Sequence, residues 1–142
     1  MMTDLCKYRM ELTKNYHSAE EDKMEGLMFP KTKKKKRRKK HKPSILHTKD
    51  GTCYLCMRLH NDYRIHAYTE EHHVFGGNPN RDRSEAEGLK VYLCPEHHRT
   101  GPEAVHNNHD NMLMVQQDAQ RVFEQTYSRK EFVKLIGRNY LE

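Results

Sequence analysis

Two pairs of residues in the sequence have the spacing of metal-binding knuckles. Cys53 and Cys56 enclose Tyr-Leu, and Cys94 and His97 enclose Pro-Glu, so two residues separate the members of each pair. Four nitrogen and sulfur ligands in such an arrangement suit a closed tetrahedral zinc site. His98 adjoins the second pair, but the two-residue spacing favours His97 as the fourth ligand. The sequence therefore predicts a structural Zn²⁺ bound by Cys53, Cys56, Cys94 and His97.

A second group of histidines lies between and directly after these pairs. His72 and His73 occur in Glu-His-His-Val-Phe-Gly-Gly, and His98 follows the second pair. Imidazole can bind a metal, and it can accept a proton near neutral pH. Adjacent residues of a strand point to opposite faces, so both could reach one site only where the strand twists or ends. An isolated histidine pair is usually exposed or hydrogen-bonded, but the flanking knuckles favour a second metal site here.

The order Cys-x-x-Cys, His-His and Cys-x-x-His-His resembles the zinc-containing HNH endonucleases. The resemblance extends from Cys53 to about His106, and its ending is similar to variants from bacteriophages and prophages. It implies an α+β fold with a small, treble-clef-like ββα-metal core that a structural zinc holds together, followed by C-terminal helices. It also implies hydrolysis of phosphodiester bonds in nucleic acid, with DNA rather than RNA as the expected substrate, and a partner among phage or recombination proteins.

The resemblance implies separate roles for three histidines. His73 would be the catalytic general base that activates water. His72 and His98 would bind the catalytic divalent ion, which would be Mg²⁺, Mn²⁺ or Ni²⁺. Such an ion neutralises charge on the phosphate and on the leaving 3′ oxygen.

The asparagine that gives the family its middle letter is missing from its usual place. Gly88 and Leu89 stand there instead, and Asn78, Asn80 and His106 are the nearest candidates to orient the base or to be the third metal ligand. This departure leaves a second hypothesis open, because a fold does not guarantee an activity. The alternative is a catalytically inactive, zinc-stabilised module that binds DNA or protein on the same scaffold.

Short strands and two helices are expected to position these residues. Residues 69–75 predict one strand, which runs into the turn signal Gly-Gly-Asn-Pro, and residues 89–93 predict a second. Asp110 is the expected N-cap of a helix with apolar residues at spacings of three and four. Ser128 and Glu131 form a capping box for the last helix.

A strongly basic segment precedes the knuckles. Residues 31–42 contain ten lysines and arginines, whereas the rest of the chain has a net charge of −4 within a total of +6. Such a run can bind several phosphates without sequence specificity. The expected nucleic-acid-binding residues are Lys33, Lys34, Lys35, Lys36, Arg37, Arg38, Lys39 and Lys40. We expect a disordered basic arm or linker over residues 30–51, after an N-terminal segment with a short helix at 1–29.

Composition limits the remainder to one small domain at 52–142. Apolar residues make up 35% of the 142 residues, charged residues make up 32%, and there is no tryptophan. A core of that size needs additional stabilisation, which a metal would supply. The sequence has no apolar run long enough to cross a membrane. Two-residue cysteine spacing favours chelation over disulfides, and together these features predict a cytoplasmic protein without a membrane partner.

Overall fold

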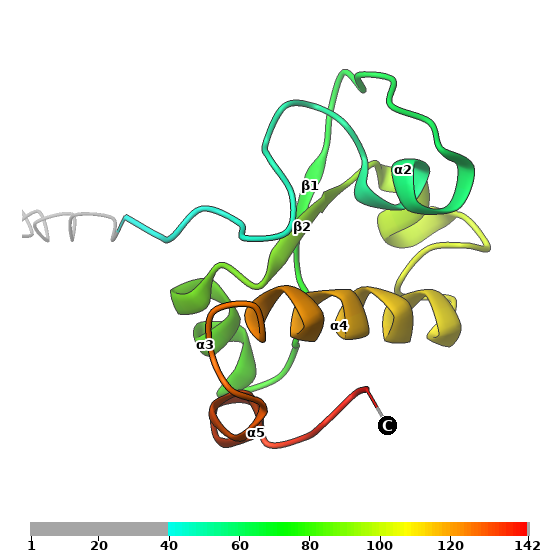
Figure 1. The fold of residues 1–142 in the computed structure, drawn as a ribbon. Coiled ribbons are helices and arrows are strands. Elements are labelled where there is room, and N and C mark those ends of the chain that lie inside the picture. The colour runs from blue at the N-terminus through cyan, green and yellow to red at the C-terminus, as the bar shows by residue number, and fades with distance from the viewer. Residues whose placement is uncertain (1–39, 142) are drawn as a thin grey trace, which may run out of the picture. The chain divides into compact units, whose positions relative to one another are not determined.

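The computed structural model describes residues 40–141, which form an α+β unit with a two-stranded antiparallel sheet (Figure 1). Its elements are α2 (Tyr54–His60), β1 (Glu70–His73), α3 (Asn80–Glu87), β2 (Lys90–Leu93), the π-helix η1 (Glu96–Thr100), α4 (His109–Phe123) and α5 (Arg129–Ile136). The predicted N-terminal segment at 1–29 and the basic residues from Lys33 to Lys39 lie outside the described residues. No helix within residues 40–141 is both long and apolar enough to cross a membrane.

The two predicted strands are present, and they pair with each other. In their antiparallel register His72 is opposite Val91, and His73 is opposite Lys90. Val91 is fully buried in the core, so His72 lies on the core-facing side of β1 and His73 lies on the other side. The connection between the strands contains α3, a polar helix that the sequence analysis did not predict. It ends at Gly88, where φ is +72° and a Cβ atom would lie 2.2 Å from the Pro43 carbonyl oxygen, so only glycine fits.

The segment before the first knuckle packs on the domain, which corrects the expectation that residues 44–51 are linker. The amide of Ile45 donates to the Gly88 carbonyl at 2.9 Å, and Ser44 donates to the Lys90 carbonyl. His47 is buried and accepts a hydrogen bond from the amide of Tyr92 at 3.3 Å. Ile45 and Leu46 pack against the core. Hydrogen bonds from its backbone and side chains thus hold this segment on the domain. Its few apolar residues had predicted little burial.

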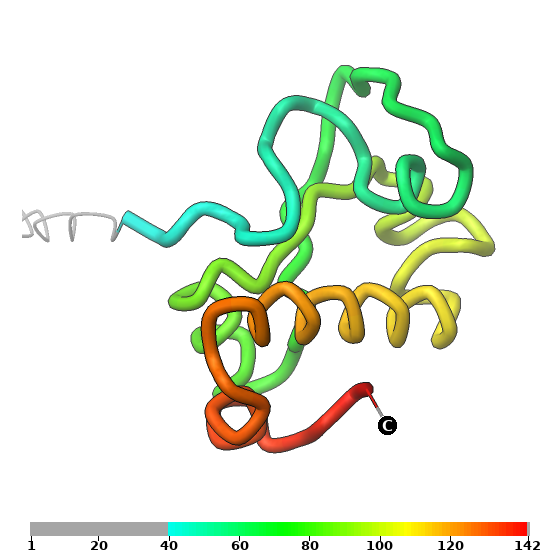
Figure 2. The backbone as a smooth tube through the Cα atoms, viewed as in Figure 1, coloured from blue at the N-terminus to red at the C-terminus, as the bar shows by residue number. Residues whose placement is uncertain are grey.

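The C-terminal helices cover the core beneath the sheet, as Figures 1 and 2 show. The capping box of Ser128 and Glu131 is confirmed at the start of α5. The expected N-cap of α4 was wrong by two residues. Asn108 is the cap, and its side chain accepts hydrogen bonds from the amides of Asp110 and Asn111, both at 3.1 Å.

Candidate metal centres

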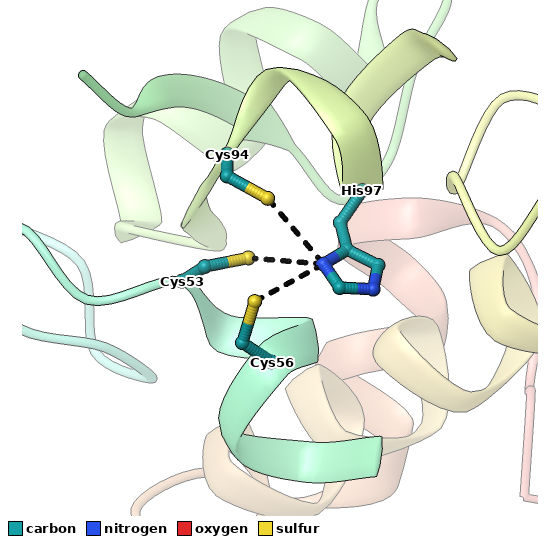
Figure 3. Close-up of side chains that lie close together, drawn as sticks. All are labelled: Cys53, Cys56, Cys94 and His97. Carbon is teal, nitrogen blue, oxygen red and sulfur yellow. Dashed lines mark hydrogen bonds between the residues drawn. The ribbon is translucent and has the colours of Figure 1, made fainter. Parts of the chain in front are cut away.

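The four predicted zinc ligands lie close together and are buried, in a group that we call the four-ligand cluster. Nδ1 of His97 is 3.7 Å from Sγ of Cys53, 3.2 Å from Sγ of Cys56 and 3.4 Å from Sγ of Cys94 (Figure 3). Tetrahedral zinc with Zn–S near 2.3 Å and Zn–N near 2.0 Å would separate sulfur from nitrogen by about 3.5 Å. The cluster is therefore compatible with a zinc site.

Two chain segments bring these ligands together. Cys53 is the N-cap of α2 and Cys56 lies in its first turn, while Cys94 follows β2 and His97 lies in η1. Burial, together with the neighbouring thiols, raises the pKa of Cys56, and burial also raises the pKa of Cys94. A metal that binds these sulfurs as thiolates must displace their protons, so its binding weakens in acid.

A carboxylate contacts the ring nitrogen of His97 that faces away from the sulfurs. Oε2 of Glu103 accepts a hydrogen bond from Nε2 of His97 at 3.4 Å and another from Nε2 of His60 at 2.9 Å. A metal-bound histidine commonly donates its second ring N–H to a carboxylate, which fixes its orientation. Sequence reasoning assigned no role to Glu103 or His60, since His60 is distant in sequence from the residues that it contacts.

Three histidines form a second cluster, the three-histidine cluster. The ring centroids of His72, His98 and His106 are 5.0–5.2 Å apart, and one nitrogen of each lies within 4.8 Å of the others. The two predicted ligands His72 and His98 are thus together, with His106 as the third member. Asn80, another of the candidates, begins α3, where its Oδ1 accepts a hydrogen bond from Arg83 at 3.3 Å.

One nitrogen of the three-histidine cluster is free to bind a cation. Nε2 of His72 is buried and has no hydrogen-bond partner within residues 40–141. A buried polar atom without a partner is costly and indicates a missing ion or water. Burial and then the neighbouring His98 and His106 lower the pKa of His72 to about 3, so its imidazole is neutral and able to bind a metal at ordinary pH.

A carboxylate also holds the second member of this cluster. Glu70 accepts a hydrogen bond from Nδ1 of His98, which leaves Nε2 as the ring nitrogen available to a metal. The hydrogen bonds from His98 and Arg99 lower the pKa of the Glu70 carboxyl. The loop that carries His106 is closed by a 2.9 Å hydrogen bond from the amide of Val105 to the carbonyl of His97.

His73, the predicted general base, lies outside the three-histidine cluster. It is on the opposite side of β1, where its Nε2 donates to the Glu85 carboxylate. Lys90 is nearly buried beside them, with its Nζ 2.8 Å from Glu85 and 3.3 Å from Glu71. Burial opposes ionisation of Glu85, but hydrogen bonds from Lys90 and His73 outweigh it and lower the pKa. Sequence reasoning missed Glu85 because it lies in the unpredicted helix α3.

The predicted basic surface is described at only one of its eight residues. Lys40 is exposed, next to His41 and Lys42. Lys42 pairs with Glu87 of α3 at 3.2 Å, and His41 lies 3.2 Å from Glu85. Acidic residues of α3 therefore contact the residues that join the basic run to the domain.

Comparisons of the chain with protein-family models, with curated proteins and with solved structures found no match.

Proposed function

We propose that this protein is a metal-dependent endonuclease of the HNH type, which hydrolyses phosphodiester bonds of nucleic acid, with DNA as the proposed substrate. The observation that carries the proposal is the three-histidine cluster, in which a buried nitrogen of His72 lacks a partner. The four-ligand cluster also supports the proposal, because its ligand His97 is directly followed by His98 of the three-histidine cluster. A rigid structural site next to a reactive one gives the positional control that catalysis requires.

Zn²⁺ is the proposed occupant of the four-ligand cluster. Three thiolates and one imidazole are the donor set of a closed structural zinc site. The separations of 3.2–3.7 Å between Nδ1 of His97 and the three sulfurs are compatible with that ion. Its role would be to fold and hold the segments that carry the histidines.

Removing the Glu103 carboxylate should loosen zinc. Because it orients His97, Glu103→Ala is expected to weaken zinc affinity by about 10–100-fold, as is typical for outer-shell partners. Glu103→Gln keeps an acceptor oxygen, so its zinc affinity should lie between those of the parent and Glu103→Ala. Glu96→Ala is a matched control, since Glu96 is exposed and adjoins His97. The measurement is zinc transfer to a chromogenic chelator. Identical transfer from Glu103→Ala and the parent would show that the carboxylate does not act on the zinc site.

The three-histidine cluster is the proposed site of the catalytic ion. When bound there, a divalent ion would neutralise charge on the phosphate and on the leaving oxygen. His72 and His106 offer imidazole nitrogens to it, and Glu70 holds the ring of His98 in place.

His73 remains the predicted general base. Its bond to Glu85 fixes one ring nitrogen and leaves Nδ1 to accept a proton from water. The position of His73 on the opposite side of β1 is the observation that favours the alternative function. In that alternative, residues 40–141 form a zinc-stabilised DNA- or protein-binding module without catalysis.

Plasmid cleavage in a panel of metals tests the proposal. Zinc-loaded protein is incubated with supercoiled plasmid and increasing Ni²⁺, Co²⁺, Mn²⁺ or Mg²⁺, with His72→Ala alongside. Imidazole ligands suit Ni²⁺ and similar ions, whereas Mg²⁺ prefers oxygen. We therefore expect cleavage with half-maximal activation by Ni²⁺ at a concentration at least about tenfold lower than by Mg²⁺. Cleavage that His72→Ala matches, or a preference for Mg²⁺, would contradict the proposed site.

A further inference from the structure

The loop between α2 and β1, residues 61–69, exposes three large side chains. The exposed fractions are 63% for Tyr63, 76% for Ile65 and 63% for Tyr68. Among the described residues the other large hydrophobic side chain with such exposure is Tyr127, at 42%. These three loop side chains therefore contribute little to the core. Figure 1 shows the loop leaving α2 and turning over the molecule into β1.

Although its side chains are exposed, the loop backbone is fixed to the first knuckle. The amide of Asp62 donates to the Cys56 carbonyl at 3.1 Å, and the amide of His66 donates to the Gly51 carbonyl at 2.9 Å. Gly51 has a φ of +92°, and a Cβ atom there would lie 2.9 Å from Ile65. The loop therefore presents its exposed rings from a fixed backbone, which lowers the entropic cost of binding.

The end of this loop is next to the three-histidine cluster. Tyr68 lies two residues before Glu70, and the Glu70 carboxylate accepts a hydrogen bond from His98. Two residues of extended chain span about 7 Å. A nucleic acid strand that crosses the three-histidine cluster therefore passes within reach of Tyr68.

Cationic groups are interspersed with these rings. Arg64 lies between the tyrosines, and its side chain is 70% exposed and pairs with Asp62 of the same loop. Exposed ion pairs contribute little, so a phosphate can compete for the guanidinium. Arg99, which is 61% exposed, adds a second cation beside Glu70. Aromatic faces with neighbouring cations are the combination that binds unpaired bases and their phosphates.

We infer that residues 61–69 bind single-stranded nucleic acid, with unpaired bases stacked on Tyr63 and Tyr68. The choice of nucleic acid as the partner rests on the proposed nuclease function. Bases within a duplex are already stacked on each other, so the loop selects flaps, single strands or melted ends. It would deliver such a strand to the three-histidine cluster.

A fluorescent reporter tests this directly, because the chain has no tryptophan. Tyr63→Trp and Tyr68→Trp each introduce a single fluorophore into the full-length, zinc-loaded protein, and Tyr127→Trp is the control. The probe is a 12-nucleotide single strand of mixed sequence, with the duplex of the same sequence for comparison, and no activating metal is added. We expect the single strand to quench emission at positions 63 and 68 but not at 127, with weaker quenching by the duplex.

Affinity for the same strand gives the second readout. Tyr63→Ala and Tyr68→Ala should each weaken the affinity about tenfold, which lies within the range expected for the loss of one stacked base. The inference is overturned if the single strand quenches emission at neither position 63 nor position 68. It is also overturned if the duplex quenches emission as strongly as the single strand does. Self-association that Tyr63→Ala abolishes would also overturn it, because the loop would then be a protein interface. Cleavage without quenching refutes the loop alone. Quenching without Ni²⁺-dependent cleavage of either the plasmid or the single strand refutes the nuclease and leaves the loop as a binding site.

Discussion

Cys94→Ser is expected to unfold residues 40–141 and to release the zinc. The three thiols and His97 tie the start of α2 to the chain that follows β2, and the three cysteine side chains form part of the core itself. In small zinc-binding peptides the ion contributes about 10–16 kcal/mol, which exceeds the usual stability of a whole small domain. Serine cannot replace the thiolate. Circular dichroism during heating should show no cooperative transition for this variant, and elemental analysis should show no zinc.

Cys6→Ser is the matched control, because Cys6 lies outside the two knuckles. It should keep the melting temperature and the zinc content of the parent, at about one zinc per chain. A parent protein that is folded and soluble without zinc would contradict the account of the four-ligand cluster. A Cys94→Ser variant that melts like Cys6→Ser would contradict it as well.

His72→Ala and His73→Ala should both stop cleavage, but for different reasons. His72 offers a nitrogen of the three-histidine cluster, so its removal acts through metal occupancy. Since even outer-shell partners change metal affinity about 10–100-fold, the loss of a ligand should cost at least as much, and excess Ni²⁺ should restore part of the rate. A general base acts on the attacking water, and its loss costs about 10²–10⁴ in rate at any metal concentration.

Cleavage rates across a metal titration separate the two variants. Asn80→Ala is the control, because Asn80 is in α3 and is not a member of the three-histidine cluster. Metal should rescue His72→Ala and not His73→Ala. If His73→Ala cuts at the parent rate, His73 is not the base, which would agree with its position on the opposite side of β1. If neither variant differs from the parent, the nuclease assignment fails and the binding module replaces it.

The parts of the site that were predictable from sequence depend on local spacing. Each knuckle is defined by the two residues between its ligands, so the members of the four-ligand cluster could be predicted from sequence spacing alone. The alternation of a strand likewise predicts that His72 and His73 face opposite sides. The capping box of Ser128 and Glu131 is also a local pattern, since each partner is within one helical turn of the other.

The parts that were missed depend on contacts between distant residues. Glu85 reaches His73 from α3, whose polar sequence carries no apolar period to predict a helix. Glu103 reaches His60 across 43 positions. His106 could be proposed only as one of several candidates, because its place beside His72 is set by the closed loop after η1. Hydrogen bonds to the second strand likewise bring residues 44–51 into the domain.

The central claim is that an ion in the three-histidine cluster enables cleavage, and a single titration tests it most directly. Increasing Ni²⁺ is added to zinc-loaded protein, and bound nickel per chain and the initial rate of plasmid cleavage are measured on the same samples. We predict that the rate rises in proportion to occupancy and levels off at about one nickel per chain. Nickel that fills the site without producing cleavage, or cleavage that does not follow occupancy, would contradict the claim.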